Sequence, residues 1–459
     1  MKIKSIQLKH TSIFNNTTLE FQYHKKPITL ILGDQGSGKT TFLRSCFQAL
    51  TWFSARYKDS RTAGVVMLDQ DISSHRLQSK LDIQVHMPSE IGSLPETSHA
   101  LETNTQICSW QLYKTLVKDS VGHSKVETTQ LEHMVGLYQK AMETDTLQGL
   151  PLIAYYPSER FVYDINLISK NTPAIFQPLN AYELTAIPYT TFARFFEWFR
   201  EICDVENAQT TDLVSRLIAN QNTENAHKDL SATLINSYNQ MHAPSLAALK
   251  QALETVFPEL TNIYLQYLPK LQLMVTYQGK DMQFQQLSNS MRNWIALVGD
   301  IVRRMCLLNP SNLYPCLEGD GILLIDQIDH QLDADHCATI LQRLNQAFPH
   351  VQIIATGHRK ALLEQAADYQ CLSLEDAHFT PVLATNAQFK LDSIYQSLDL
   401  NLAPAVHESV ILEPLHENQE TPESLANFIQ QNFSNEQQKQ LVELLNQSDN
   451  EPFEKQEYE

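Results

Sequence analysis

The sequence predicts an α/β protein: a mixed sheet with flanking helices, split by a mostly helical insertion and followed by a short, helical, acidic tail. Two observations lead to this prediction. An apolar run at 27–32 leads into a glycine-rich loop at 33–40 and then into a helical pattern at 41–53. Farther along, between 291 and 356, apolar runs of strand length alternate with helical patterns, which is typical of a sheet covered by helices.

The first 72 residues form one half of the predicted α/β domain. Residues 2–8 and 18–23 alternate apolar and polar side chains around a polar turn at Asn15 and Asn16, which predicts a β-hairpin. The run PITLIL at 27–32 is almost wholly apolar, as expected for a strand buried on both faces of a parallel sheet. We therefore assign residues 1–72 to the first half of this domain.

Residues 73–254 have a different pattern, and we expect them to form an inserted, mostly helical arm or lid. The first part of this range, up to residue 150, is polar and mixed. Helical patterns lie at 127–144, 189–206, 210–242 and 245–256. The insertion would separate the two halves of one domain.

Strand patterns resume in the second half of the domain, residues 255–406. The expected order is strands at 262–267 and 271–277, a helix at 291–308, a strand at 321–326, a helix at 334–347 and a strand at 351–356. The tail, 407–459, holds twelve Asp and Glu against two Lys. Within it, Thr421-Pro422-Glu423 has the N-cap, the N1 proline and the first-turn acid of a helix start.

Composition excludes several classes of protein. The 459 residues are 43% hydrophobic and 19% charged, typical of a globular chain. No apolar run approaches the roughly 18 residues of a membrane span, and the start MKIKSIQLKH lacks the apolar core of a signal peptide. The seven cysteines form no CxxC pair, which favours buried free thiols. We expect a cytoplasmic protein that does not contact membranes.

The net charge of −18 is unevenly distributed. Residues 1–61 hold ten Lys and Arg against three Asp and Glu, whereas the remainder of the chain is acidic. Nonspecific nucleic-acid binding relies on clustered Lys and Arg, so the overall charge argues against it. The basic N-terminal segment leaves two interpretations open, which are contact with a phosphate backbone or a solvated surface.

The loop at 33–40 reads GDQGSGKT, the G-x-x-x-x-G-K-T pattern of a phosphate-binding loop. The chain has only 13 glycines, yet Gly33, Gly36 and Gly38 fall within six residues. Glycine lets backbone N–H groups curl around phosphate oxygens where a Cβ would collide. The loop therefore predicts a nucleotide phosphate site.

Four side chains of the loop extend this prediction. Lys39 would supply a charge to the β- and γ-phosphates, and Thr40 would offer a hydroxyl to Mg²⁺. Ser37 and Thr41 complete the expected nucleotide-binding set. The cofactors predicted from this loop are ATP and Mg²⁺.

Three further motifs follow the loop in a recognisable order. The strand GILLID at 321–326 ends at Asp326, whose carboxylate can hold Mg²⁺ through water. Before it, the segment Leu287-Ser288-Asn289-Ser290 opens a long helix, and after it His358 follows the strand at 351–356. Phosphate loop, helix, acidic strand and lone histidine form the ordered motif set of ABC-type ATPases.

The sequence resembles the RecF/SMC-like branch of ABC-type ATPases, and it looks most like bacterial AAA ATPases of anti-phage systems, of the Septu and retron-associated kind, and their virulence-linked relatives. The resemblance implies a P-loop ABC-type ATPase head. The matching segments are GDQGSGKTT at 33–41, AYYPSER at 154–160, FFEWFREICDVEN at 195–207, LSNSMRNWIALVGDIVRRM at 287–305 and LLIDQIDHQLD at 323–333.

The resemblance also implies a nucleotide-sandwiched dimer or a higher oligomer. Each ATP would lie between the phosphate loop of one subunit and the signature helix of its partner, with Ser288 reaching across to the γ-phosphate. Asp333 would be the D-loop acid and His358 the switch histidine. Gln70 is either the Q-loop glutamine or an ordinary polar loop residue.

Two departures from the family pattern predict slow hydrolysis. Gln327 stands where the family has a catalytic Glu, and an amide can position water but cannot accept its proton. Ser290 replaces the signature glycine, and its Cβ would crowd a close approach to phosphate. Two points stay open: whether nearby Asp329 takes over the role of the Glu, and whether Gln327 is natural or an engineered trapping substitution.

The favoured function is an ATP-binding switch subunit that dimerises on nucleotide and controls a separate effector, a nuclease in an anti-phage operon. The acidic tail would be either a docking element or a solvated terminus. The alternative is a RecF-like DNA-repair ATPase that binds DNA directly through the basic residues 1–61. Overall acidity counts against this alternative.

Overall fold

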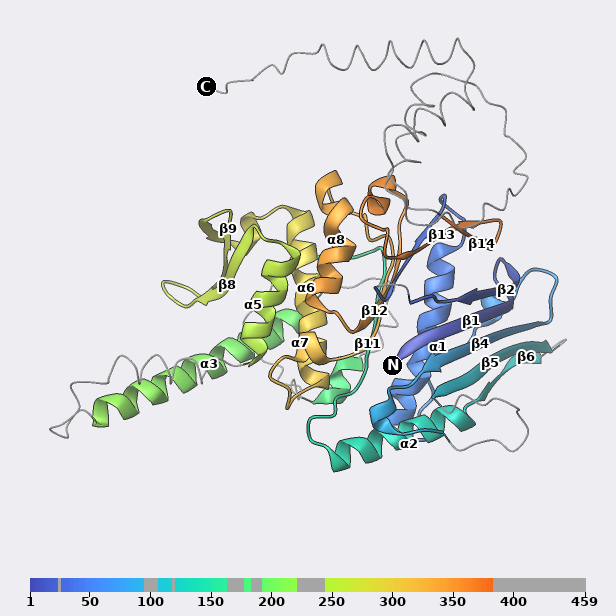
Figure 1. The fold of residues 1–459 in the computed structure, drawn as a ribbon, viewed down its shortest axis with the longest axis horizontal. Coiled ribbons are helices and arrows are strands. Elements are labelled where there is room, and N and C mark those ends of the chain that lie inside the picture. The colour runs from blue at the N-terminus through green and yellow to red at the C-terminus, as the bar shows by residue number, and fades with distance from the viewer. Residues whose placement is uncertain are drawn as a thin grey trace, which may run out of the picture. The chain divides into compact units, whose positions relative to one another are not determined.

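Three β-sheets organise the described part of the chain (Figure 1). The computed structural model describes residues 1–23, 26–94, 106–117, 120–162, 177–182, 192–220 and 244–382. All of them belong to one unit, Met1–Ile394, while a second unit, Tyr395–Glu459, lies outside the described residues. The expected acidic tail at 407–459, with its helix start at 421–423, and the part of the 210–242 helix beyond 220 therefore lie outside the described residues as well.

The largest sheet has six strands in the order β14-β13-β3-β12-β11-β7. These strands are β3 (Ile28–Leu32), β7 (Leu152–Tyr156), β11 (Gly321–Ile325), β12 (Val351–Thr356), β13 (Gln370–Glu375) and β14 (His378–Pro381). Neighbours are parallel except for the β13–β14 pair. The strands predicted at 27–32, 321–326 and 351–356 are confirmed, and the mixed α/β class is confirmed with them.

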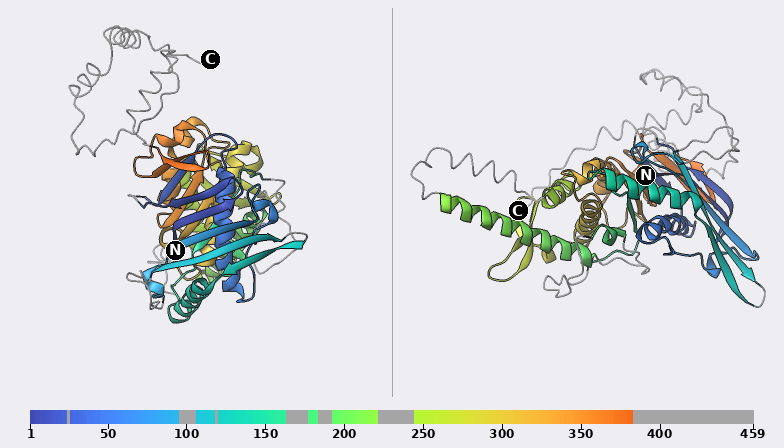
Figure 2. Two further views of the ribbon diagram at one scale, coloured as in Figure 1. Left: turned by 90° about the vertical axis from the view of Figure 1, so that its right-hand side faces the viewer. Right: turned by 90° about the horizontal axis from the view of Figure 1, so that it is seen from below.

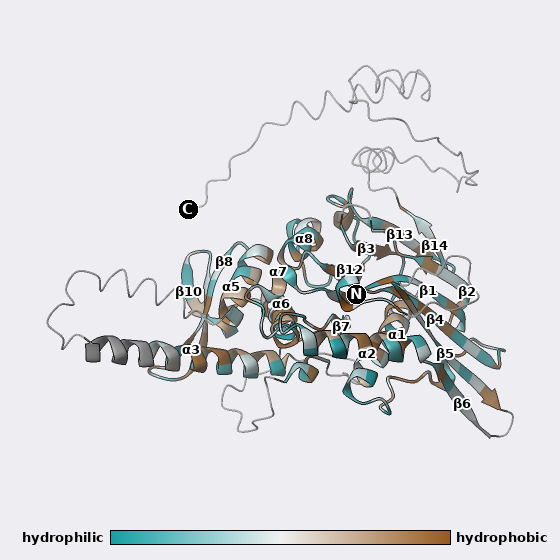
Figure 3. Cartoon of the chain, turned by 60° about the horizontal axis from the view of Figure 1, so that its bottom comes forward, coloured by the Kyte–Doolittle hydropathy of each residue, from teal (hydrophilic) through white to brown (hydrophobic). Residues whose placement is uncertain are grey.

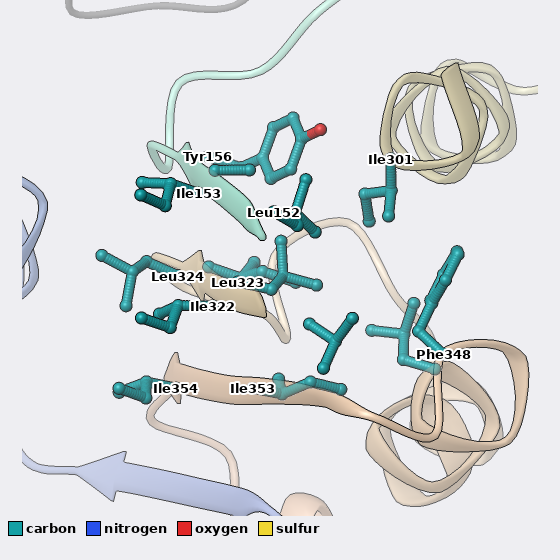
Figure 4. Close-up of a cluster of buried hydrophobic side chains, with 14 of the residues drawn as sticks. Leu152, Ile153, Tyr156, Ile301, Ile322, Leu323, Leu324, Phe348, Ile353 and Ile354 are labelled. Carbon is teal, nitrogen blue, oxygen red and sulfur yellow. The ribbon is translucent and has the colours of Figure 1, made fainter. Parts of the chain in front are cut away.

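Helices cover both faces of this sheet, which is why its central strands are buried along nearly their whole length and mostly apolar. Every residue of β11 and β12 is buried. On one face lie α6 (Asn289–Leu308) and α8 (Ala334–Ala347), where Leu323 points toward Ile301 and Phe348 (Figure 4). On the other face α1 (Lys39–Lys58) packs against β7 and β11. The sheet is therefore the central layer of the core.

An antiparallel sheet of five strands, ordered β2-β1-β4-β5-β6, packs on the far side of α1, so that α1 lies between two sheets (Figure 2). Its strands are β1 (Lys2–Thr11), β2 (Phe14–Glu20), β4 (Gln78–His86), β5 (Ile107–Val117) and β6 (Ser120–Glu127). The predicted N-terminal hairpin is confirmed by the β1–β2 pair. Its turn lies at Ser12 and Ile13, because Thr11 pairs with Phe14, and Asn15 and Asn16 belong to β2.

Strands β4 to β6 correct the mostly helical insertion expected over 73–254. Alternate residues of β4 and β5 are buried, and Figure 3 shows these strands coloured by hydropathy. Ser79 and Lys114 are buried among the apolar residues of these strands and interrupt the apolar pattern in the sequence. β7 falls in the same range and belongs to the six-stranded sheet. The helices expected at 127–144 and 245–256 form as α2 (Thr129–Thr144) and α5 (Pro244–Val256). The helix expected at 189–206 and the start of the one expected at 210–242 form a single helix, α3 (Ala193–Asn220), without the expected break.

The third sheet lies beside the helical layer. Its strands are β8 (Leu260–Gln266), β9 (Gln272–Tyr277) and β10 (Lys280–Gln283), in the order β10-β9-β8. They confirm the strands predicted at 262–267 and 271–277. The remaining elements are α7 (Pro315–Glu318) and 3-10 turns at Asp69–Asp71, Ser89–Ile91, Pro178–Tyr182, Phe284–Gln286 and Lys360–Leu363. α5 packs on β8, α6 and α8 and so joins this sheet to the core.

The seven cysteines are all buried and free, as the sequence predicts. Among the described ranges, no helix has both the length and the apolar character needed to cross a bilayer.

The first turns of α3 pack on α6, where a Cβ at Gly299 would lie 2.3 Å from Phe195. The aromatic side chains at the start of α3 therefore pack closely against α6 in the core.

A buried ionic network joins α6 to the end of β7. The carboxylate of Asp300 accepts hydrogen bonds from Arg303 Nε (2.9 Å), Arg304 Nε (2.8 Å) and the Tyr156 hydroxyl (2.8 Å). Burial raises the pKa of Asp300, but the guanidinium groups of Arg304 and Arg303 outweigh burial and hold that pKa below its usual range. The network fixes the carboxyl end of β7, which leads into the functional site.

Neutralising Asp300 as Asp300→Asn is expected to lower the free energy of unfolding by about 3 kcal/mol, because two buried guanidinium groups lose their charged partner. Since the pKa of Asp300 is lower in the folded protein, its contribution is present above about pH 4 and is lost as the pH falls further. Urea unfolding at pH 7 measures the loss, with Glu254→Gln, an exposed acid on α5, as control. Equal stability of the Asp300 variant and the wild type would contradict this prediction.

Candidate functional site

The carboxyl ends of four parallel strands meet at one edge of the six-stranded sheet. Ligands of such sheets bind outside this edge. The loop at 33–40 follows β3, Asp326 follows β11, His358 comes two residues after β12, and residues 157–160 follow β7. The topology therefore brings together most of the motifs that the sequence singles out.

The phosphate loop adopts backbone angles that favour glycine. Gly33, Gly36 and Gly38 have φ of 149°, 82° and 99°. A Cβ on Gly33 would lie 2.6 Å from the carbonyl oxygen of Leu374, and a Cβ on Gly38 would lie 2.2 Å from the side chain of Ile13. Steric crowding and backbone conformation thus both explain why a glycine-poor chain keeps glycine here.

Lys39 opens α1 and is largely buried inside this loop. Its Nζ donates to the carbonyls of Gly33 (2.6 Å) and Asp34 (2.7 Å) and to Ser37 Oγ (3.3 Å). Burial lowers the pKa of Lys39, and the nearby carboxylates of Asp326 and Asp34 oppose that shift. The loop therefore places a cation at the N-terminus of a 20-residue helix, an arrangement that suits a polyphosphate anion.

Asp326 is fully buried, and two hydroxyls hold its carboxylate. Thr40 Oγ1 donates to Oδ2 at 2.7 Å, and Thr356 Oγ1 donates to Oδ1 at 2.6 Å. Thr40 belongs to α1 and Thr356 to β12, so the carboxylate links the loop helix to two strands. A hydroxyl and a carboxylate from these positions are the oxygen ligands that Mg²⁺ prefers, and the pair fits the predicted metal site.

The backbone of Gln327 is fixed, while its side chain is not. Its N–H donates to Thr356 Oγ1 (2.9 Å), its carbonyl accepts from Arg160 (3.0 Å), and its φ is 46°. The amide is half-buried and makes no hydrogen bond with another described residue. The structure thus holds position 327 beside Asp326 and leaves its amide free.

His358 is oriented by Asp329, a fully buried acid. Oδ2 of Asp329 accepts from the backbone N–H of His358 (2.9 Å) and of Arg359 (2.8 Å), and it lies 3.0 Å from Nδ1 of His358. The histidine side chain itself is 58% exposed. Asp329 therefore positions the loop that carries His358, and this role differs from the catalytic role left open in the sequence.

A cleft of about 1020 Å³ opens between the phosphate loop helix and the segments 64–71 and 155–159. Thr40, Thr41 and Asp326 line it, and so does Gln70. Gln70 therefore lines the same cleft as the two predicted Mg²⁺ ligands, Thr40 and Asp326. Its volume is in the upper range for small-molecule sites.

Ser288 and Asp333 lie elsewhere, as the N-caps of α6 and α8. Ser288 Oγ accepts from the N–H of Met291 (3.2 Å), and Asp333 Oδ1 accepts from the N–H of His336 (2.8 Å). The hydrogen bond from the His336 N–H lowers the pKa of Asp333. Neither side chain makes a hydrogen bond to the phosphate loop within the described residues.

Arg160 is a site residue whose role the sequence analysis did not predict. Its buried guanidinium donates to the carbonyls of Asp326 (2.6 Å), Gln327 (3.0 Å) and Pro157 (3.0 Å), and it lies 5.7 Å from the Trp294 ring centroid. Burial lowers the pKa of Arg160 to about 10, against the attraction of Asp326, so the side chain remains charged at neutral pH. A lone arginine four residues after a buried strand was the available signal.

A phosphate loop, an acidic strand end and a histidine after the next parallel strand define a P-loop ATPase head of ABC type. The chain belongs to the AAA domain family, whose model matches residues 5–261. Relatives and solved structures add further similarities.

Three curated relatives are similar in sequence, two retron probable ATPases and one Septu protein. The Retron Vc95 probable ATPase of Vibrio cholerae serotype O1 biovar El Tor is 25% identical over 438 residues, which is 89% of this chain and 82% of that protein. The Retron Ec83 probable ATPase of Escherichia coli is 25% identical over 78% of this chain and 68% of its own length. The Septu protein PtuA of Bacillus mycoides (strain KBAB4) is 30% identical over 120 residues, which is 25% of this chain and 16% of PtuA.

Among solved structures, the Smc head domain of Pyrococcus furiosus bound to the C-terminal domain of ScpA is similar. Its TM-score is 0.44 at 12% identity, over 86% of this chain and 99% of that one. In sequence, this chain is related to the two retron probable ATPases and, over a shorter segment, to the Septu protein PtuA.

Proposed function

We propose that this protein is an ATP-binding switch subunit that closes into a nucleotide-sandwiched dimer with Mg²⁺ and thereby controls a separate effector in anti-phage defence. The observation that carries the proposal is the linked set of Lys39, Thr40 and Asp326 at the carboxyl edge of the sheet. The names of the retron and Septu relatives support the defence role. A nuclease is the effector class that we propose.

Binding would begin at the phosphate loop. Lys39 would exchange its contacts with the carbonyls of Gly33 and Asp34 for phosphate oxygens, since an ammonium prefers an anionic acceptor. Thr40 and Asp326 would hold Mg²⁺, which supplies positive charge to the phosphates. The buried Thr356 hydroxyl keeps the Asp326 carboxylate oriented during this exchange.

Hydrolysis would be slow because of position 327. The amide of Gln327 can donate to or accept from a water molecule, but it cannot take the proton of that water. The exposed ring of His358, held by Asp329, is available to contact phosphate oxygens. This set of residues favours long-lived ATP binding over rapid turnover.

The dimer is supported by the position of Ser288. It caps α6, a 20-residue helix with no acid in its first turn, and its side chain is exposed. Such a helix N-terminus suits an anion, yet no hydrogen bond joins it to the phosphate loop of its own chain among the described residues. We infer that it serves the nucleotide of a second subunit.

Replacing this cap as Ser288→Arg is expected to prevent ATP-dependent dimerisation while ATP still binds the monomer, because a bulky side chain would occupy the space that the partner's phosphate needs. Light scattering after size exclusion, with and without Mg²⁺ and ATP, measures the mass. Ser89→Arg, at an exposed position on a separate 3-10 turn, is the control. A Ser288 variant that dimerises as the wild type does would refute the composite site.

A further inference from the structure

We propose that Glu159 is the general base of this ATPase, the carboxylate that takes the proton of the water attacking the γ-phosphate. The inference rests on the proposed function and deepens it. Gln327 leaves the expected position without a base. Asp329, the alternative considered from sequence, is fully buried, does not line the cleft and holds the loop of His358 through Oδ2. A different carboxylate must therefore serve if ATP is hydrolysed.

Three acids line the cleft within the described residues, namely Asp71, Glu159 and Asp326. Both oxygens of Asp326 accept hydroxyl hydrogen bonds. Asp71 accepts from the N–H of Leu68 at 2.7 Å and closes a 3-10 turn. Glu159 is exposed to the cleft. Of the three, Glu159 is the one whose carboxylate makes no hydrogen bond or ion pair with another described residue.

The backbone that carries Glu159 is held against Asp326 and Gln327. β7 pairs in parallel with β11, with Tyr156 opposite Ile325, and the N–H of Asp326 donates to the carbonyl of Tyr156 at 2.9 Å. The next residue after Glu159, Arg160, donates to the carbonyls of residues 326 and 327. The backbone of Glu159 is therefore anchored on both sides, and Glu159 lines the same cleft as Thr40 and Asp326.

The anchoring explains how a carboxylate outside the expected motif can act with useful precision. A base must sit within hydrogen-bond reach of the proton that it removes, which requires a fixed backbone. The Arg160 guanidinium fixes this backbone, because it donates hydrogen bonds to the carbonyls of Pro157, Asp326 and Gln327 and so joins residues 157–160 to the end of β11. The AYYPSER segment thus combines an anchor, Arg160, with a base, Glu159.

In the proposed step, the water oxygen forms a bond to the γ-phosphorus as the bond from that phosphorus to the β,γ-bridging oxygen breaks. The electron pair of the broken bond stays on the bridging oxygen, which leaves as part of ADP. One water proton passes to the Glu159 carboxylate and then to solvent. The products are ADP, inorganic phosphate and a proton, and the carboxylate is restored.

The test compares single-turnover hydrolysis of ATP by the full-length wild type and by Glu159→Gln. We expect the rate to fall about 100-fold, the lower range of general-base effects, with ATP affinity and unfolding temperature unchanged. The matched control is Asp71→Asn, which removes a carboxylate from the same cleft and should keep the wild-type rate.

Each other outcome overturns the assignment. A wild-type rate in Glu159→Gln removes Glu159 from the reaction, and a tenfold loss of ATP affinity or a lowered unfolding temperature gives it a binding or structural role instead. A wild type that binds ATP and never hydrolyses it also ends the proposal for Glu159, while the ATP-binding switch stands. A wild type that does not bind ATP overturns the proposed function itself.

Discussion

Replacing Lys39 with alanine is expected to weaken ATP binding by at least about 100-fold. The variant loses the one charged contact that the loop offers to phosphate, and charge-assisted hydrogen bonds contribute about 1.5–3 kcal/mol each. In the absence of nucleotide, the same Nζ donates hydrogen bonds to the carbonyls of Gly33 and Asp34. The variant therefore also loses the hydrogen bonds that stabilise the conformation of the loop. Titration with a fluorescent ATP analogue measures the affinity.

Lys58→Ala is the matched control for this prediction. Lys58 ends the same helix, and its side chain is exposed, so its loss changes the charge without touching the loop. The far-ultraviolet circular dichroism of both variants should match that of the wild type. If Lys39→Ala still bound ATP with wild-type affinity, the loop would not be a phosphate site, and the proposed switch would fail.

Local patterns were enough to locate the phosphate loop and the acidic strand end. The glycine-rich segment between an apolar run and a helical pattern predicted the loop at 33–40, and the run ending at Asp326 predicted its partner. The structure joins these through the Thr40 hydroxyl at 2.7 Å. Both signals are short-range in sequence, since each depends on a strand and the few residues after it.

Strands β4 to β6 of the five-stranded sheet were missed because β4 and β5 carry polar residues on their buried face. Ser79 is hidden on β4, where Thr11 Oγ1 lies 2.8 Å from its hydroxyl. Lys114 is hidden on β5, where its ammonium lies 2.9 Å from Asp69. These partners come from other segments, so the pattern alone looked like a polar loop. The alternation of the remaining buried positions was the available signal for strands.

The roles of Glu159 and Arg160 depend on pairing between distant segments. Arg160 reaches the carbonyl of Asp326, 166 residues away in the sequence, only because β7 lies beside β11. No spacing rule in the sequence states that two strands are neighbours. The AYYPSER segment was therefore noticed for its resemblance alone, and the sheet order was needed to relate it to position 327.

Introducing the acid of the family pattern as Gln327→Glu is expected to raise the steady-state rate of ATP hydrolysis about 10-fold to 100-fold, because a carboxylate directly after Asp326 would be a better-placed base than Glu159. The backbone at 327 is already fixed by Thr356 and Arg160, so the new carboxylate would stand beside Asp326 without rearrangement. A coupled assay for ADP or phosphate release measures the rate. Gln48→Glu, which adds a carboxylate elsewhere in the same cleft, is the control and should not raise it.

The double variant Glu159→Gln with Gln327→Glu decides whether the two positions serve the same step. Residues that share one role give non-additive effects in such a cycle. If Glu159 is the native base, removing it should cost about 100-fold with Gln at 327 but only a few-fold with Glu at 327, because the new acid takes over. Equal losses in both backgrounds would show that Glu159 acts independently of the base. A wild type that already hydrolyses ATP rapidly, with no gain from Gln327→Glu, would instead show that Gln327 does not limit hydrolysis.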